Sequence, residues 1–164
     1  MIPKIRRILY TTDLSLNAAY VFRYALSSAE KHDATIEVLH ALHPTSEMGF
    51  SSQGVKVEAI VQKIKKRIEN LAEEELQDRP SLIGRVSNIR VIPGDPVAVI
   101  LQAVEDLKPD ILIMGTHSQG MIANALLGSV AMKVLQRIRI PVYIIPIPPL
   151  PAHYVNWLMR QQEK

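Results

Sequence analysis

The residues best suited to chemistry lie between Gly115 and Ser129. An apolar run at residues 111–114 ends in Gly115, a polar stretch follows, and Gly128-Ser129 opens a helical pattern. This layout places flexible backbone and the start of a helix at the carboxyl end of a buried strand. Free N–H groups and the helix dipole favour an anion such as phosphate at such a point. The segment therefore indicates nucleotide binding as the first hypothesis.

A second polar group, Thr11-Thr12-Asp13, follows the first apolar run of the chain. If the first and fourth strands are neighbours where the winding of the sheet reverses, Asp13 faces the glycine-containing segment across a crevice. A carboxylate there can accept hydrogen bonds from ribose hydroxyls or hold Mg²⁺ through phosphates. Asp13 can equally cap the turn or helix that follows it, and the sequence leaves both roles open.

Better-known motifs are absent or incomplete. The spacing of Gly115 and Gly120 is that of a P-loop, but Met121-Ile122 stand where lysine and a hydroxyl residue are required. His40 and His43 are three residues apart at a strand end, so their rings point to opposite faces and a metal site is disfavoured. His117 could contact a phosphate or simply be solvated. No Ser-His-Asp or paired-carboxylate arrangement stands out, and no catalytic residue is assigned.

Strand patterns alternate with helix patterns along the chain. Short apolar runs predict strands at residues 4–12, 34–42, 85–92, 110–114 and 140–145. Helical spacing predicts a helix after Ser15 or Asn17, one over Val57–Leu76, one after the Asp95-Pro96 cap, and one from Gly128-Ser129 that carries Ile138. The alternation predicts an α/β fold, an open five-stranded parallel sheet with helices on both faces.

Length and composition narrow the class of protein. The chain has 164 residues, 48% hydrophobic and 21% charged, which is typical of one soluble globular domain. The absence of cysteine excludes disulfides and thiolate chemistry. No run resembles a signal peptide or approaches the roughly 20 apolar residues of a membrane span, so we expect a cytoplasmic protein without membrane contact. The basic run from Lys63 to Arg67 lies beside glutamates, and aromatic residues are few, which argues against a nucleic-acid partner.

An ordered set of motifs resembles the universal stress protein family over roughly residues 3–146. The set consists of Thr11-Thr12-Asp13, Leu39-His40-Ala41, Gly94-Asp95-Pro96, Ile113–His117 leading to Leu127–Val130, and Ile140–Ile145. The resemblance implies a Rossmann-like parallel sheet of the adenine nucleotide alpha hydrolase type, and a dimer that often forms through the last strand. We therefore expect a domain at residues 1–146 and a proline-rich tail with a short helix at 147–164.

One branch of that family binds ATP through the signature G-x2-G-x9-G-(S/T). Gly115, Gly128 and Ser129 match it, but Ser118 stands where the second glycine is expected. A serine Cβ can block close approach to phosphate, whereas its hydroxyl can also donate to a phosphate oxygen. The resemblance implies a nucleotide-binding set of Thr12, Asp13, Ala41, Met114, Gly115, His117, Ser118, Gly128, Ser129 and Val130, with Asp13 also the candidate to hold Mg²⁺.

The resulting interpretation is a stress-response regulator that binds ATP, with Mg²⁺ as a further cofactor and an unidentified protein as a further partner. The last strand is very apolar and is expected at a sheet edge, where pairing through Val142 and Ile144 would cover it in a homodimer. Two alternatives remain open. One is a nucleotide-free interaction protein of the same fold, and the other is a weak ATP hydrolase, although no P-loop lysine or catalytic base is evident.

Overall fold

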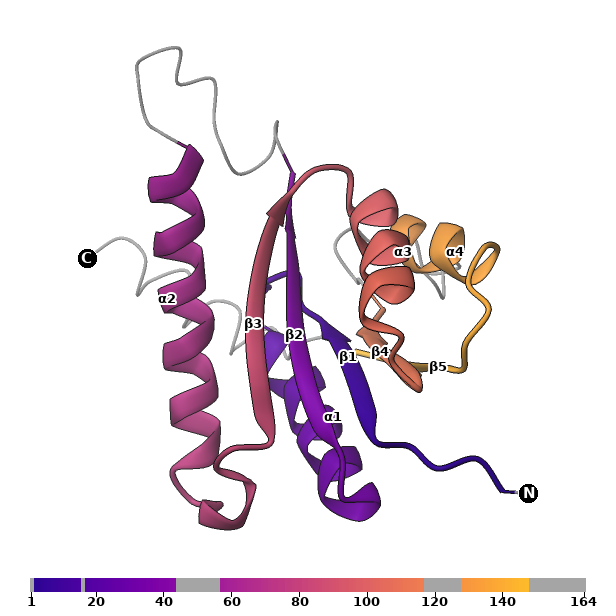
Figure 1. Cartoon of the computed structure of the whole chain (residues 1–164). Coiled ribbons are helices and arrows are strands. Elements are labelled where there is room, and N and C mark those ends of the chain that lie inside the picture. The colour runs from indigo at the N-terminus through magenta and orange to yellow at the C-terminus, as the bar shows by residue number, and fades with distance from the viewer. Residues whose placement is uncertain (1, 16, 44–56, 117–127, 148–164) are drawn as a thin grey trace.

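A computed structural model describes residues 2–15, 17–43, 57–116 and 128–147 of the chain. In these residues five parallel strands form one sheet in the order β3-β2-β1-β4-β5, which confirms the predicted fold class (Figure 1). The elements are β1 (Arg7–Thr11), α1 (Ala18–His32), β2 (Thr35–Leu42), α2 (Val57–Leu76), a 3-10 turn (Pro80–Leu82), β3 (Val86–Pro93), α3 (Pro96–Leu107), β4 (Ile111–Gly115), α4 (Ser129–Leu135) and β5 (Val142–Ile145).

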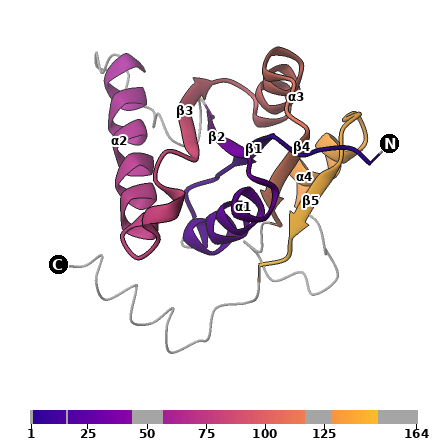
Figure 2. The same cartoon turned by 60° about the horizontal axis from the view of Figure 1, so that its bottom comes forward.

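The core has two layers, one on each face of the sheet. Alternate residues of a strand point to opposite faces, so Ile8 and Tyr10 pack with α1 and α2, while Leu9 packs with α3 and α4. Figure 2 shows α1 and α3 on opposite sides of the strands. β1 and β4 supply fully buried side chains to both layers, which is why their sequences are almost continuously apolar.

The register of β3 contains an irregularity that the sequence pattern conceals. Ile36 pairs with Val86 but Glu37 pairs with Asn88, so Ser87 is an extra residue in β3. The Ser87 hydroxyl donates to the Ile36 carbonyl at 3.1 Å. Because of this bulge, Val86 and Ile89 face the same core layer although they are three residues apart.

The turn between β3 and α3 follows the predicted chemistry. The Asp95 carboxylate accepts from the Ala98 amide at 3.0 Å and Pro96 occupies the first helical position. Gly94 has a φ of +149°, a conformation that L side chains rarely adopt. The turn therefore fixes where α3 begins, and with it the residues that α3 presents at this end of the sheet.

Three predicted boundaries differ from the structure by two or more residues. β1 begins at Arg7 rather than residue 4. α1 begins after Asn17, one of the two predicted starts, although Asn17 makes no side-chain cap bond. α4 ends at Leu135, so Ile138 lies beyond the helix. β5 begins at Val142, because Pro141 has no N–H to donate to the sheet.

The length and the apolar character of the helices determine whether one of them could span a membrane. Among the described residues, no helix combines the length and the apolar character needed to cross a bilayer. The expected tail at residues 147–164 and the segment 44–56 lie outside the described residues, apart from Ile147. Ile147 packs against the α1 side of the core, so the chain still contacts the domain two residues after β5.

Candidate functional site

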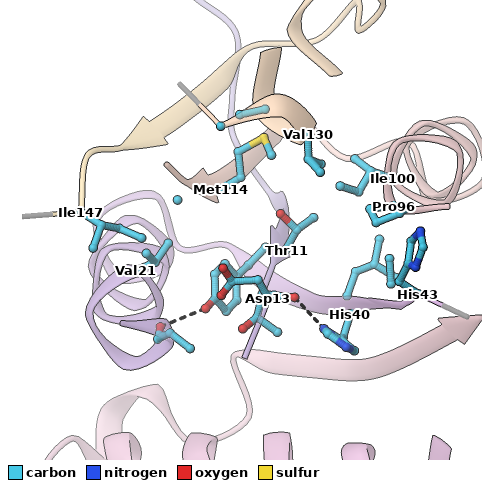
Figure 3. Close-up of a pocket in the computed structure, with 18 of the residues that line it drawn as sticks. Thr11, Asp13, Val21, His40, His43, Pro96, Ile100, Met114, Val130 and Ile147 are labelled. Carbon is cyan, nitrogen blue, oxygen red and sulfur yellow. Dashed lines mark hydrogen bonds between the residues drawn. The ribbon is translucent and has the colours of Figure 1, made fainter. Parts of the chain in front are cut away.

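The winding of the sheet reverses between β1 and β4. β1 pairs with β2 on one side and β4 on the other, and the chain leaves β1 into α1 on one face while the helix after β4, α4, covers the other face. A crevice must therefore open beyond the carboxyl ends of these two strands. The structure has a cavity of about 380 Å³ at this point (Figure 3). The neighbouring position of the first and fourth strands, on which the sequence argument depended, is thus confirmed.

The walls of the cavity come from both faces of the sheet: the ends of β1, β2 and β4, the starts of α1, α3 and α4, and Ile147. Figure 3 shows Val21 of α1 and Ile147 on one side, and His43, Pro96 and Ile100 on the other, with Asp13 between them. Further lining residues come from the ends of the strands and the start of α4: Tyr10, Thr11, Thr12, Leu39, His40, Ala41, Met114, Gly115, Gly128, Ser129, Val130 and Ala131.

Eight of the ten residues of the predicted nucleotide-binding set line this one cavity. They are Thr12, Asp13, Ala41, Met114, Gly115, Gly128, Ser129 and Val130. The other two, His117 and Ser118, lie outside the described residues, as does the middle of the signature. The structure thus brings the eight residues together from four separate stretches of sequence, and their binding role stays a prediction.

Asp13 is part of a tight turn. Its Oδ1 accepts from the Ser15 amide at 2.9 Å, and the Thr12 hydroxyl accepts from the Leu14 amide at 3.1 Å. Leu14 has a φ of +56°, a left-handed conformation that these side-chain bonds stabilise. Of the two roles left open by the sequence, the turn role is therefore present in the structure. The same turn places Asp13 in the lining of the cavity.

His40 is a buried residue whose role sequence reasoning missed. Its side chain is only 2% exposed, and its Nδ1 lies 2.8 Å from the Thr12 carbonyl oxygen. Because a carbonyl only accepts, Nδ1 carries the proton and donates. This bond joins the end of β2 to the exit of β1, next to Asp13. Among the described residues, no group of three or more His, Asp or Glu side chains could hold a metal ion.

Close packing explains one of the two signature glycines, Gly115. A Cβ on Gly115 would lie 2.8 Å from Val21 Cγ2 and 3.0 Å from Ile147 Cδ1, so close packing requires glycine there. Gly128 has a φ of −62° and a ψ of 157°, which any residue can adopt.

Tyr10 has a structural role in the site and does not supply a base. Burial raises the pKa of its phenol well above the ordinary value, so the group stays protonated. Its hydroxyl donates to the Ala18 carbonyl at 3.0 Å, close to the start of α1. The ring also stacks on Phe22, with centroids 5.4 Å apart. Tyr10 thus anchors α1 against β1 beneath the cavity.

The fold and the cavity define an α/β protein with a ligand-sized hollow at its switch point. The sequence profile of the Universal stress protein family matches residues 4–146. This chain belongs to that family.

Individual relatives agree with the assignment. A universal stress protein of Thermus aquaticus is 29% identical over 141 residues, covering 85% of this chain and 98% of its own. A universal stress protein solved in complex with cAMP superposes with a TM-score of 0.61 at 20% identity, covering 88% of this chain and 98% of that one. One from Archaeoglobus fulgidus in complex with dAMP gives a TM-score of 0.51 at 17% identity, with coverage of 88% and 99%.

Proposed function

We propose that this protein binds an adenine nucleotide, ATP in the first instance, in the cavity between β1 and β4 and acts as a nucleotide-dependent regulator in stress response. The observation that carries the proposal is the convergence of three strand exits and the start of α4 on one cavity of about 380 Å³. That volume falls within the range of small-molecule pockets. Complexes of relatives with cAMP and dAMP support an adenine nucleotide as the ligand.

The chemistry of the walls fits the parts of such a ligand. Leu39, Ile100 and Met114 offer apolar surface suited to an adenine ring. Thr12 and Asp13, which follow β1, lie in the same lining and supply oxygens that can accept from ribose hydroxyls. Each part of a nucleoside thus has a chemically matched partner within the described lining.

Phosphates would have to be held without lysine or arginine. None of the described residues that line the cavity carries a permanent positive charge. The remaining donors are the backbone amides at Gly128, Ser129 and Val130, which stand where a helix begins and its first N–H groups have no intrahelical partner. Mg²⁺ would neutralise part of the phosphate charge, with Asp13 as one ligand from the protein. No residue is assigned to catalysis, so hydrolysis is not part of the proposal.

Calorimetric titration of ATP, with and without Mg²⁺, tests the binding step. Gly128→Trp adds bulk at the cavity wall, and Lys133→Trp on the exposed side of α4 is the matched control. We expect micromolar binding by the unmodified chain and by the control, and loss of at least about tenfold in affinity for Gly128→Trp. No binding by any of the three would favour the alternative of a nucleotide-free interaction protein.

Asp13→Asn tests the proposed contact with the metal. The amide keeps an oxygen to accept from the Ser15 amide, so the turn should persist, but it is a poorer ligand for Mg²⁺. The benefit of Mg²⁺ for ATP affinity should shrink in the variant. An unchanged benefit would remove Asp13 from the metal site while leaving nucleotide binding intact.

The proposal includes a homodimer through β5. β5 is an edge strand that pairs only with β4 among the described residues, and its Tyr143 side chain is 40% exposed. An apolar edge strand is an aggregation hazard unless it is covered. Val142→Lys should shift the sedimentation of a dimer towards the monomer at micromolar concentration. A chain that sediments as a monomer before any substitution would contradict this part of the proposal. The cytoplasmic location stays a prediction.

A further inference from the structure

A second hollow lies at the other end of the α3–α4 pair. The strands are parallel, so the helices that return between them run the opposite way, and α3 and α4 both start at the cavity and end at the amino ends of the strands. Near those ends a cleft of about 320 Å³ opens between the last turns of α3, the turn after α4 and the approach to β5. We call it the basic cleft, after the charges on its rim.

The floor of the basic cleft is apolar. Leu101 and Val104 of α3 face Ile138 and Ile140, which precede β5. Val104 is 8% exposed and the other three are half-buried, so apolar surface remains open to a ligand. Ile138 belongs to this floor because it lies beyond the end of α4. Aliphatic floors of this kind take aliphatic or aromatic side chains.

The rim carries three cations and one carboxylate. Lys108, Arg137 and Arg139 line the cleft together with Glu105, and all four are exposed. Across the described parts of the chain, none of these three basic side chains has an ion-pair or hydrogen-bond partner. Other arginines do, since Arg23 binds Glu75 through two bonds of 2.7 and 2.9 Å and Arg90 binds Glu37 at 2.9 Å. The cations of the cleft are thus available to carboxylates from outside.

Helix dipoles do not account for this cluster. A cation is stabilised within the last turn of a helix, and Lys108 does stand at the end of α3. Arg137 and Arg139, however, follow α4, which ends at Leu135, and Arg139 is more than a turn beyond it. The turn after α4 presents both arginines to the same cleft that Lys108 lines.

We propose that the basic cleft docks a short acidic segment of a protein partner, with an aliphatic side chain on the floor and carboxylates at Lys108, Arg137 and Arg139. Arginine binds carboxylate through two parallel hydrogen bonds, which gives direction as well as attraction. A small phosphate compound would leave the apolar floor uncovered. A nucleic acid would meet Glu105 on the rim and Asp106 beside it, so its phosphates find no continuous basic track. This inference does not depend on nucleotide binding.

Fluorescence anisotropy with the full chain tests the proposal. The probe is a short fluorescein-labelled peptide of alternating Glu and Leu, and its Gln-and-Leu counterpart reports apolar contact alone. We expect the acidic peptide to bind and the double variant R137E/R139E to weaken it roughly tenfold, since two favourable charge pairs become repulsive. The matched double variant K31E/K63E changes the net charge equally on α1 and α2, and it should weaken binding by less than about threefold.

Several outcomes would overturn the proposal. Equal affinity for the Gln-and-Leu peptide would show that the carboxylates do not contribute to binding. Equal weakening by R137E/R139E and K31E/K63E would show that the attraction depends on net charge and not on the cleft. Competition by inorganic pyrophosphate as strong as by unlabelled peptide would make the cleft a small-anion site instead. Amide chemical shifts decide the location, because the acidic peptide should shift Val104 and Ile140 and leave His40 unchanged. Retained circular dichroism in both double variants separates a lost contact from a lost fold.

Discussion

The two ends of the sheet differ in how their polar groups are used. At the amino end, the Asp110 carboxylate accepts from the Arg6 and Arg7 amides at 2.8 and 2.9 Å, and the Arg7 guanidinium donates to the Leu107 carbonyl at 3.0 Å. At the carboxyl end, β1 and β4 separate, and their polar residues surround a cavity. The amino end thus fixes β1, β4 and α3 together, while the carboxyl end leaves space for a ligand.

This difference follows from the topology. Consecutive strands are joined by helices that return to the amino end, so β2 to β5 are each entered from a turn there, where a side chain such as Asp110 can bond to the start of a neighbouring strand. At the carboxyl end the helices that follow β1 and β4, α1 and α4, cover opposite faces, and no connection among the described residues closes the gap. Substitutions at the two ends should therefore have different signatures, with stability changed at one end and ligand affinity at the other.

The largest loss of stability and of ATP affinity is expected from overpacking at the carboxyl end of the sheet. In Gly115→Val the added carbons meet the Val21 and Ile147 side chains, which are already 2.8 and 3.0 Å from the position of a Cβ. We expect a loss of about 1–3 kcal/mol in the free energy of unfolding, together with loss of ATP binding. Gly115→Ala should lose less stability and less ATP affinity than Gly115→Val. Urea denaturation and calorimetry measure the two effects, and a valine variant with unchanged stability would contradict the packing account.

A smaller effect is expected at the amino end from Asp110→Asn. The charge-assisted bonds to the Arg6 and Arg7 amides weaken, and because the site is partly exposed we expect a loss of about 1 kcal/mol at neutral pH. Nucleotide affinity should not change. Urea denaturation gives the first value and calorimetry the second, and a variant that loses ATP affinity without losing stability would contradict the division between the two ends.

The same carboxylate gives a pH dependence with a defined sign. Burial opposes ionisation of Asp110, but the two backbone amides and the nearby arginines outweigh it and lower its pKa. A carboxylate whose pKa is depressed in the folded state adds stability above its unfolded pKa of about 3.9 and loses it as the pH falls through the folded pKa. The free energies of unfolding of the unmodified chain and of Asp110→Asn should therefore converge as the pH falls into the acid range. Parallel curves down to the lowest pH would contradict the assignment.

The smallest effect is expected between the cavity and the basic cleft. α3 lines both, with Ile100 at the cavity and the adjacent Leu101 at the cleft. If both proposed ligands bind, we expect ATP to change the affinity of the acidic peptide by about two- to threefold, and the peptide to change ATP affinity by the same factor. Titrations in both orders measure this. A factor of one in both orders would contradict the coupling between the two sites.

Features that neighbouring residues determine could be predicted from the sequence, whereas contacts between residues far apart in the sequence could not. The spacing of neighbouring residues determines the helix Val57–Leu76 and the Asp95 cap of α3, and both were predicted with their observed positions. The switch point between β1 and β4 followed from the alternation of elements and the polar strand exits. The family resemblance then selected eight residues that share one cavity.

Contacts between remote segments were not predictable. The bond from His40 to the Thr12 carbonyl joins residues 28 apart, and the packing of Gly115 involves Ile147, which lies beyond the last strand. The bulge at Ser87 changes a face without changing the apolar pattern. The basic cleft joins residues near 108 to residues near 138, and its members appear scattered in the sequence.

An ATP titration followed by amide chemical shifts of the described residues tests the central claim most directly. If the cavity is the nucleotide site, Thr12, Ala41 and Val130 shift together with one affinity, while Arg7 and Asp110 at the amino end stay unchanged. Shifts confined to the amino end, or no shifts at millimolar ATP, would contradict it.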